Sequence, residues 1–311
     1  MIKRDEKIEN VFKAWLTALD TKSLTPIKLA YAAGAAVELA KATEDEVYNT
    51  FALKVADEFV SRLYADELEK GNLANMKLAY TLYYAHAKTG KDSYAEAIKK
   101  AAELISAQKR SENGLFINEG TDAARKEICI CQAYLSQVFY MKYESTYGGK
   151  ERYNDIIAQY NAYRADYYGD KASKIAQDAD AAKVVALFAA ALIDTMEVVD
   201  QPMYEIFRRM QALYKEAVAD MIKADVFTNC DMAAVMASYA VLKGCRMKAL
   251  HTEKYEAVAL KVLSAAVDVA EAEDKTADAG WMAALAMSYS ESLKNREYQD
   301  YGRGKGGALW S

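Results

Sequence analysis

The amino-acid sequence predicts an all-α fold, a closed (α/α)6 barrel of six alternating inner and outer helix pairs. Three observations support this prediction. The 311-residue chain is rich in helix-forming residues and has only two prolines, Pro26 and Pro202. Two kinds of helical segment alternate along it, and one kind recurs about every fifty residues. We expect residues 1–311 to form a single barrel domain, with residues 302–311 as a tail.

The outer helices are predicted from a repeated pattern in which a tyrosine opens an amphipathic segment. Apolar residues recur there at three- and four-residue spacing, so that one stripe packs on the protein and the opposite face meets water. The first outer helix is the N-terminal segment, about residues 4–20. The others begin near Tyr48, Tyr94, Tyr153, Tyr204 and Tyr255.

The inner helices are predicted from segments that are apolar on most sides and rich in alanine. Such a helix must be covered on most sides, and its small residues let neighbouring backbones approach closely. The segments are residues 25–40, 72–87, 126–141, 180–196, 229–244 and 278–293. The first outer helix and the last inner helix each lack a partner in the sequence. Joining them completes the sixth pair, which favours a closed ring over an open solenoid.

Charge and hydropathy exclude two classes of partner. The net charge is −5 and no basic stripe is present, so we expect no nucleic-acid partner. No apolar stretch approaches the roughly 20 residues needed to cross a bilayer, so we expect no membrane partner. The charged N-terminus lacks the apolar run of a signal peptide. We expect a cytoplasmic protein as the sequence stands, and a periplasmic or secreted one if a leader was trimmed.

The number and spacing of the cysteines and histidines do not favour a metal site. Cys129 and Cys131 are two apart in a helical pattern, on different faces, which suits neither a disulfide nor a zinc site. We expect them, with Cys230 and Cys245, to be small core residues, which favours a reducing compartment. The two histidines lie in different segments. We therefore expect no metal and no cofactor.

Polar residues gather where the inner helices begin. In a closed ring the inner helices are parallel, so their N-termini open at one rim, where unpaired backbone N–H groups favour acids and anions. Helix capping is the simpler explanation for Thr25, Asp178 and Asp278, since Thr and Asp are common N-caps. Asn75, Glu127 and Asp231 are predicted about a turn after the cap, where a cavity role and capping both remain open.

A rim of carboxylates and tyrosines suits a polyhydroxylated ligand such as a small oligosaccharide. Hydrolysis of a sugar needs a carboxyl group that can give up a proton. Glu127, at the start of the third inner helix, is the candidate acid. We expect tyrosines of the inner helices in the core, with stacking on a sugar as the alternative. The expected substrate-binding residues are Asp180, Lys183, Asn229, Asp231 and Asp278.

Several segments resemble unsaturated glucuronyl and rhamnogalacturonyl hydrolases, glycoside hydrolase families 88 and 105. The likeness covers most of the chain and is clearest in "CDMAAVMASYAVLKGCRMKALHTEKYEAVALKVL" (230–263). Also similar are "KLAYTLYYAHAKTGKDSYAEAIKKAAELI", "SENGLFINEG", "ICICQAYLSQVFYMKY" and "DYGRGKGGALWS". The resemblance implies the same barrel. It also implies protonation of the C4–C5 double bond of an unsaturated uronic acid and addition of water, after which a hemiketal collapses and releases the sugar.

The chain departs from the family pattern at the catalytic positions. A family aspartate at the start of the second inner helix corresponds to Asn75 or Ala74, and an asparagine cannot serve as an acid or a base. The family's acid at the start of the third inner helix is best matched by Glu127. The family's "GRGNGW" falls near "DADAAK", which leaves Lys183 in place of the tryptophan.

We therefore predict a divergent member that acts on or binds small uronate-containing oligosaccharides. The alternative is a catalytically inactive relative that binds a carbohydrate or a protein partner. Another enzyme of the same fold, such as an epimerase or a lyase, is disfavoured by the missing histidines.

Overall fold

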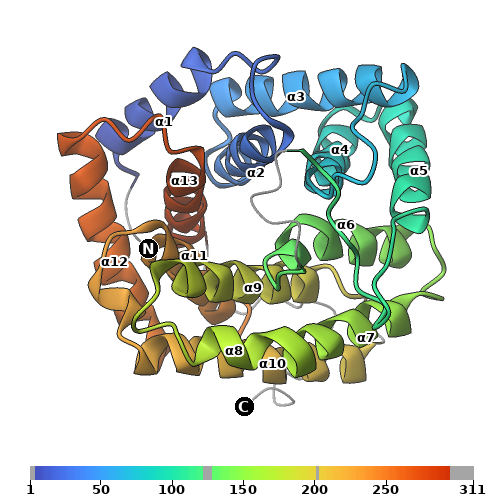
Figure 1. Cartoon of the computed structure of the whole chain (residues 1–311). Helices are drawn as coiled ribbons and strands as arrows, with labels where there is room; N and C mark the ends of the chain where they lie inside the picture. Colours follow the sequence, from blue (N-terminus) through green and yellow to red (C-terminus); the bar gives the residue numbers. More distant parts are fainter. Residues whose placement is uncertain (1–3, 122–127, 201–202, 295–311) are drawn as a thin grey trace.

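The computed structural model describes residues 4–121, 128–200 and 203–294, and within these ranges the chain is built from helices joined by turns (Figure 1). An isolated β-bridge joins Arg110 to Phe116 in the connection between α5 and α6. Within the described residues, no helix has the length and hydropathy needed to span a bilayer.

The inner helices form a closed ring. They are α2 (Pro26–Thr43), α4 (Ala74–Thr89), α6 (Gln132–Thr146), α9 (Ala179–Glu197), α11 (Met232–Arg246) and α13 (Ala279–Leu293). Each packs against the next, and α13 packs against α2, which completes the circle. Because these helices are covered on nearly all sides, α13 buries every residue from Ala279 to Ser292. The predicted (α/α)6 barrel is confirmed.

The outer helices lie around this ring, as Figure 1 shows. They are α1 (Glu6–Ala18), α3 (Glu46–Tyr64), α5 (Asp92–Ser106), α7 (Tyr153–Tyr163), α10 (Tyr204–Lys223) and α12 (Thr252–Ala272). The helix α7 continues through the π-helical turn η1 (Arg164–Tyr168) into α8 (Gly169–Ala172), and η2 (Val226–Thr228) precedes α11. In α12 the buried residues are Ala259, Val262, Leu263, Ala266 and Ala270, one helical stripe.

The first and last helices meet directly. Helix α1 packs against α12, and the Tyr289 hydroxyl of α13 donates to Glu9 Oε1 at 2.8 Å and accepts from the Asp5 backbone N–H at 2.8 Å. Arg4 holds the same Glu9 carboxylate through its Nε and Nη2 atoms, at 2.8 and 2.5 Å. The side-chain carboxylate of Asp5 also caps α1 by accepting from the Lys7 backbone N–H. The ends of the ring are therefore joined by polar contacts, of which the Tyr289–Glu9 hydrogen bond is buried, as well as by apolar packing.

The third inner helix starts later than its sequence predicts. We expected residues 126–141, but α6 begins at Gln132, and residues 122–127 lie outside the described part of the chain. Cys129 and Cys131 occupy the turn before α6 and are paired as a disulfide, so the expectation of two unpaired thiols is wrong. Both cysteines precede the first residue of α6, so their side chains are not held apart by the helical spacing that the sequence predicts. Because two of the four cysteines form a disulfide, the cysteines do not support the predicted reducing compartment.

Candidate functional site

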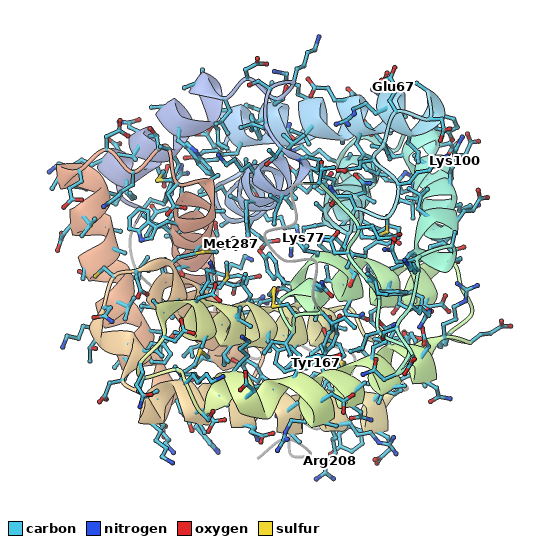
Figure 2. All side chains as sticks on the ribbon, viewed as in Figure 1. Glu67, Lys77, Lys100, Tyr167, Arg208 and Met287 are labelled. Carbon is cyan, nitrogen blue, oxygen red and sulfur yellow. A yellow bond between two sulfur atoms is a disulfide. The ribbon has the colours of Figure 1, made fainter. Side chains whose placement is uncertain are left out.

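A cluster of buried charged residues lies inside the ring. Lys77 of α4 and Lys243 of α11 both face the carboxylate of Asp194 on α9, with Nζ–O distances of 3.5 and 2.7 Å. The Tyr239 hydroxyl donates to the same carboxylate at 2.5 Å. The two lysines and the aspartate are each at most 8% exposed as side chains. Figure 2 labels Lys77 and Met287 near the centre of the ring.

Two tyrosines form a layer over Lys77. Its Nζ lies 3.6 Å from the centroid of the Tyr134 ring, a cation–π contact in a desolvated setting. The Tyr31 ring of α2 stacks on Tyr134 with the centroids 6.1 Å apart. Tyr134 is buried, whereas Tyr31 is half-buried. The layer therefore presents Tyr31 to solvent and Lys77 to the cluster beneath.

Open space adjoins the cluster. A cavity of about 20 Å³ is lined by Gly34, Lys77, Asp194, Tyr239, Lys243 and Met287, among other residues. A Cβ atom placed on Gly34 would meet no other atom within 4 Å. Glycine inside a helix costs about 1 kcal/mol relative to alanine. Gly34 thus keeps the ring open one turn from Tyr31, on the same face of α2.

The two lysines differ in how well their charge is compensated. Burial alone lowers the pKa of Lys243, but the carboxylates of Asp194 and Glu197 outweigh it and hold that pKa well above its usual value. Burial also lowers the pKa of Lys77, and here Asp194 does not make up the loss, since the positive charge of the nearby Lys243 lowers this pKa further. An anion bound beside Lys77 would therefore stabilise the protonated form of its amine.

A chain of ion pairs continues from this cluster to the C-terminal ends of the inner helices. Arg246 donates to Glu197 at 2.7 Å and to Glu291 at 2.6 Å. Lys294 contacts Glu291 at 2.5 Å and Glu38 at 2.6 Å. Burial by itself raises the pKa of Glu291, but Lys294 and Arg246 outweigh burial and lower it. These pairs link α2, α9, α11 and α13 across the interior.

The amino-acid sequence also matches the model of a known protein family. The sequence model of Glycosyl Hydrolase Family 88 matches residues 8–183, more than half of the 311-residue chain. The chain belongs to glycosyl hydrolase family 88. It is a glycoside hydrolase-like protein similar to unsaturated uronyl hydrolases, for which a small oligosaccharide is the class of substrate. An inactive relative that binds a carbohydrate or a protein is not favoured.

A solved structure supports the fold of this family 88 protein. The glycoside hydrolase from family 105 of C. acetobutylicum ATCC 824 superposes on it with a TM-score of 0.68. The superposition covers 93% of this chain and 100% of that one, at 15% sequence identity. No curated protein sequence matches the chain.

The predicted rim residues of this family 88 protein lie at the N-terminal ends of the inner helices. Asp231 is itself the N-cap of α11 and accepts from the Ala234 N–H at 2.9 Å, so it does not follow the cap by a turn as we expected. Asp278 caps α13 in the same way, and Asn229 is exposed just before α11. Asp180, in the first turn of α9, pairs with Lys183 at 3.2 Å.

Two other capping predictions have different outcomes. Asp178 caps α9 by accepting from the Asp180 N–H. Thr25 occupies the N-cap position of α2 but makes no side-chain hydrogen bond there.

Of the two candidate catalytic residues, only Asn75 lies in the described part of the chain. Asn75 is buried in the first turn of α4, where its Nδ2 donates to the Glu69 carbonyl at 2.8 Å. It lines a cleft of about 520 Å³ between α3, α4 and α5, away from the cavity beside Lys77. Glu127 lies outside the described residues. Departures from the family pattern at these positions remain a prediction.

The interior cluster of Lys77, Asp194 and Lys243 was not predicted from the sequence. A usable signal was present, since each is an isolated charge within a segment assigned to the apolar inner ring. A buried charge normally has a charged or hydrogen-bonding partner. Isolated charges in several inner helices therefore indicate a shared polar centre.

Proposed function

We propose that this protein binds the unsaturated uronate end of a small oligosaccharide inside the ring, with the uronate carboxylate against Lys77. The observation that carries the proposal is the position of Lys77, buried and 3.5 Å from Asp194, whereas Lys243 contacts both Asp194 and Glu197 at 2.7 Å. A carboxylate bound at Lys77 would form a charge-assisted hydrogen bond in a site largely removed from water. Such a bond contributes about 1.5–3 kcal/mol.

The layer of tyrosines offers a surface for a further sugar ring of the oligosaccharide. Tyr31 is half-buried and can be covered by the apolar face of a sugar, whereas Tyr134 beneath it is already buried. Gly34 leaves room beside Tyr31, because no atom lies within 4 Å of the position of its missing Cβ. Because Tyr134 lies between Tyr31 and Lys77, the sugar ring on Tyr31 and the uronate whose carboxylate contacts Lys77 would belong to different residues of the oligosaccharide.

The rim residues would contact the remainder of the oligosaccharide. Asp180, Lys183, Asn229, Asp231 and Asp278 are the candidates, since all lie at or near the starts of inner helices. Glu127 is the candidate general acid that protonates the C4–C5 double bond before water adds. This assignment of the acid rests on the sequence match alone.

Binding and turnover of an unsaturated uronyl disaccharide test the proposal. Hydration removes the double bond, so turnover is followed by the loss of ultraviolet absorbance, and affinity is measured by calorimetry. Lys77→Met should weaken binding of the uronate by roughly tenfold or more and leave binding of a neutral disaccharide unchanged. Lys77→Arg should retain part of the affinity, because it keeps the charge. Lys183→Met is the matched control at the rim, with a smaller expected loss.

The fold should survive the substitution of Lys77, because Asp194 keeps its contacts with Lys243 and Tyr239. A thermal unfolding curve confirms this before binding is compared. If Lys77→Met binds the uronate as tightly as the native protein does, the uronate carboxylate does not contact Lys77. If the native protein neither binds nor consumes any unsaturated uronide, the proposed substrate class is wrong.

A further inference from the structure

The disulfide before α6 joins a buried cysteine to a partly exposed one. Cys129 is 3% exposed, whereas Cys131 is half-buried and is the N-cap residue of α6. The bond closes a loop of only three residues, from Cys129 to Cys131. A disulfide stabilises a fold mainly by restricting the unfolded chain, and this effect is small for a short loop. A structural crosslink is therefore a weak explanation of the pair.

The surroundings of the two sulfurs suit thiol–disulfide exchange. An attacking thiolate must reach one sulfur while the other leaves as a thiolate. Cys131 is the reachable residue, and its backbone N–H donates to Cys129 Sγ at 3.4 Å, which stabilises negative charge on the leaving sulfur. After reduction, the N-terminus of α6 favours the thiolate of Cys131.

We propose that Cys129 and Cys131 form a redox-active pair that exchanges with low-molecular-weight thiols through Cys131. In the first step the thiolate of the small thiol attacks Cys131 Sγ, the bond between the cysteines breaks, and Cys129 leaves as the thiolate. A second molecule of thiol attacks the outer sulfur of the mixed disulfide and releases Cys131. Two thiols are oxidised to one small disulfide, and the protein gains two electrons and two protons.

The pair lies next to the interior cluster but does not depend on its function. Tyr134, three residues after Cys131, is the ring that contacts Lys77. Reduction therefore acts on the turn that begins the helix carrying this ring. The exchange itself requires only the two cysteines and the start of α6, so it can be tested without any sugar.

The test equilibrates the full-length native protein with glutathione and glutathione disulfide at graded ratios, followed by alkylation and intact mass measurement. At oxidising ratios, Cys129 and Cys131 should be protected and only the two free cysteines, Cys230 and Cys245, should be alkylated after unfolding. At reducing ratios all four should be alkylated. Failure of the folded protein to gain two alkylation sites at any ratio overturns the proposal, as does the absence of a protected pair at every ratio.

Single variants test the direction of attack. Cys129→Ser leaves the accessible thiol and should form a glutathione adduct with glutathione disulfide, whereas Cys131→Ser leaves the buried thiol and should react at least about tenfold more slowly. Cys230→Ser is the control, with unchanged exchange at the pair. Equal rates in the two variants contradict attack through Cys131. Circular dichroism establishes that each variant is folded, and the native titration decides the redox activity even where a variant does not fold.

Discussion

Arg246 on α11 and Glu291 on α13 are joined inside the ring by two hydrogen bonds, from Nε to Oε2 at 2.6 Å and from Nη2 to Oε1 at 3.1 Å. Their side chains are 4% and 0% exposed. Arg164 and Glu216 form a pair of the same geometry, at 2.7 and 2.6 Å, but their side chains are 43% and 35% exposed. The two pairs differ in burial, and the buried pair also contacts Glu197 and Lys294.

Replacement of one partner should therefore have very different costs at these two sites. Arg246→Met leaves the carboxylate of Glu291 buried with less compensation, and we expect it to lower the free energy of unfolding by about 3–5 kcal/mol. Arg164→Met, the control, should cost about 0–1 kcal/mol. Urea unfolding at neutral pH measures both. Equal losses would show that burial of the ion pair does not govern its contribution.

Gly34 and Gly244 should respond in opposite directions to the same substitution, although both lie within inner helices. Gly34→Ala places a methyl group in open space and should raise the free energy of unfolding by about 0.5–1 kcal/mol, the helix preference of alanine. Gly244→Ala would collide with the hydroxyl of Tyr214, which donates to the Ala240 carbonyl at 2.7 Å. We expect a loss of about 1–3 kcal/mol there. Thermal and urea unfolding of both variants checks the contrast.

Glu144 should make the protein less stable as the pH rises. Burial raises the pKa of this carboxyl group above its usual value, and the Arg152 backbone N–H opposes the shift only in part. The folded protein therefore binds the proton more tightly than the unfolded chain. Its contribution is fully present below the unfolded pKa of about 4.5 and is lost as the pH rises through the folded pKa.

The variant Glu144→Gln isolates this contribution, because a glutamine amide does not titrate and its oxygen can still accept from Arg152. The stability of the variant relative to the native protein should increase from pH 4 to pH 7 (approximate limits of the window). Urea unfolding at several pH values measures the difference. A difference that is independent of pH would show that Glu144 has an ordinary pKa.

Glu127→Gln tests the candidate acid. If Glu127 protonates the double bond, its amide should lower the rate of hydration by about 10²–10⁴-fold with little change in affinity, since general acid catalysis contributes that much. Glu119→Gln is a matched control, because Glu119 is an exposed carboxylate of the same connection that pairs with Lys109. Full activity of Glu127→Gln would assign the proton donor to another group.

Asp231 allows capping to be separated from ligand binding. Asp231→Ala removes the oxygen that accepts from the Ala234 N–H and should cost about 0.5–2 kcal/mol of stability. Asp231→Ser keeps a capping oxygen without the charge and should be close to the native protein in stability. If the carboxylate also contacts the sugar, the serine variant should lose affinity in calorimetry. Unchanged affinity in that variant would leave Asp231 with a capping role alone.

The sequence was sufficient to predict the ring because the two environments of a helix leave different patterns. A helix covered on nearly all sides, such as α13, is apolar all round, whereas α12 shows a single buried stripe. The tyrosines that open the outer segments are equally informative. Tyr153 and Tyr204 are the first residues of α7 and α10, and both were predicted near the starts of helices.

The start of α6 and the interior cluster were beyond the reach of local patterns. Cys129 and Cys131 are apolar enough to continue the helical pattern backwards from Gln132, so the turn that brings them together leaves no compositional trace. Lys77, Asp194 and Lys243 come from three different helices. Which isolated charges meet depends on how far each side chain reaches across the closed ring, and periodicity does not contain that distance.

Closure of the ring also constrains how the protein is made. Helix α2, the first inner helix in order of translation, is covered on one flank by α4, the second, and on the other by α13, the last. When translation has reached the end of α11, the faces of α2 and α11 that contact α13 in the folded protein are therefore still uncovered. The barrel can close only after α13 has left the ribosome, so the contacts of α13 with α2 and α11 form last among those of the ring.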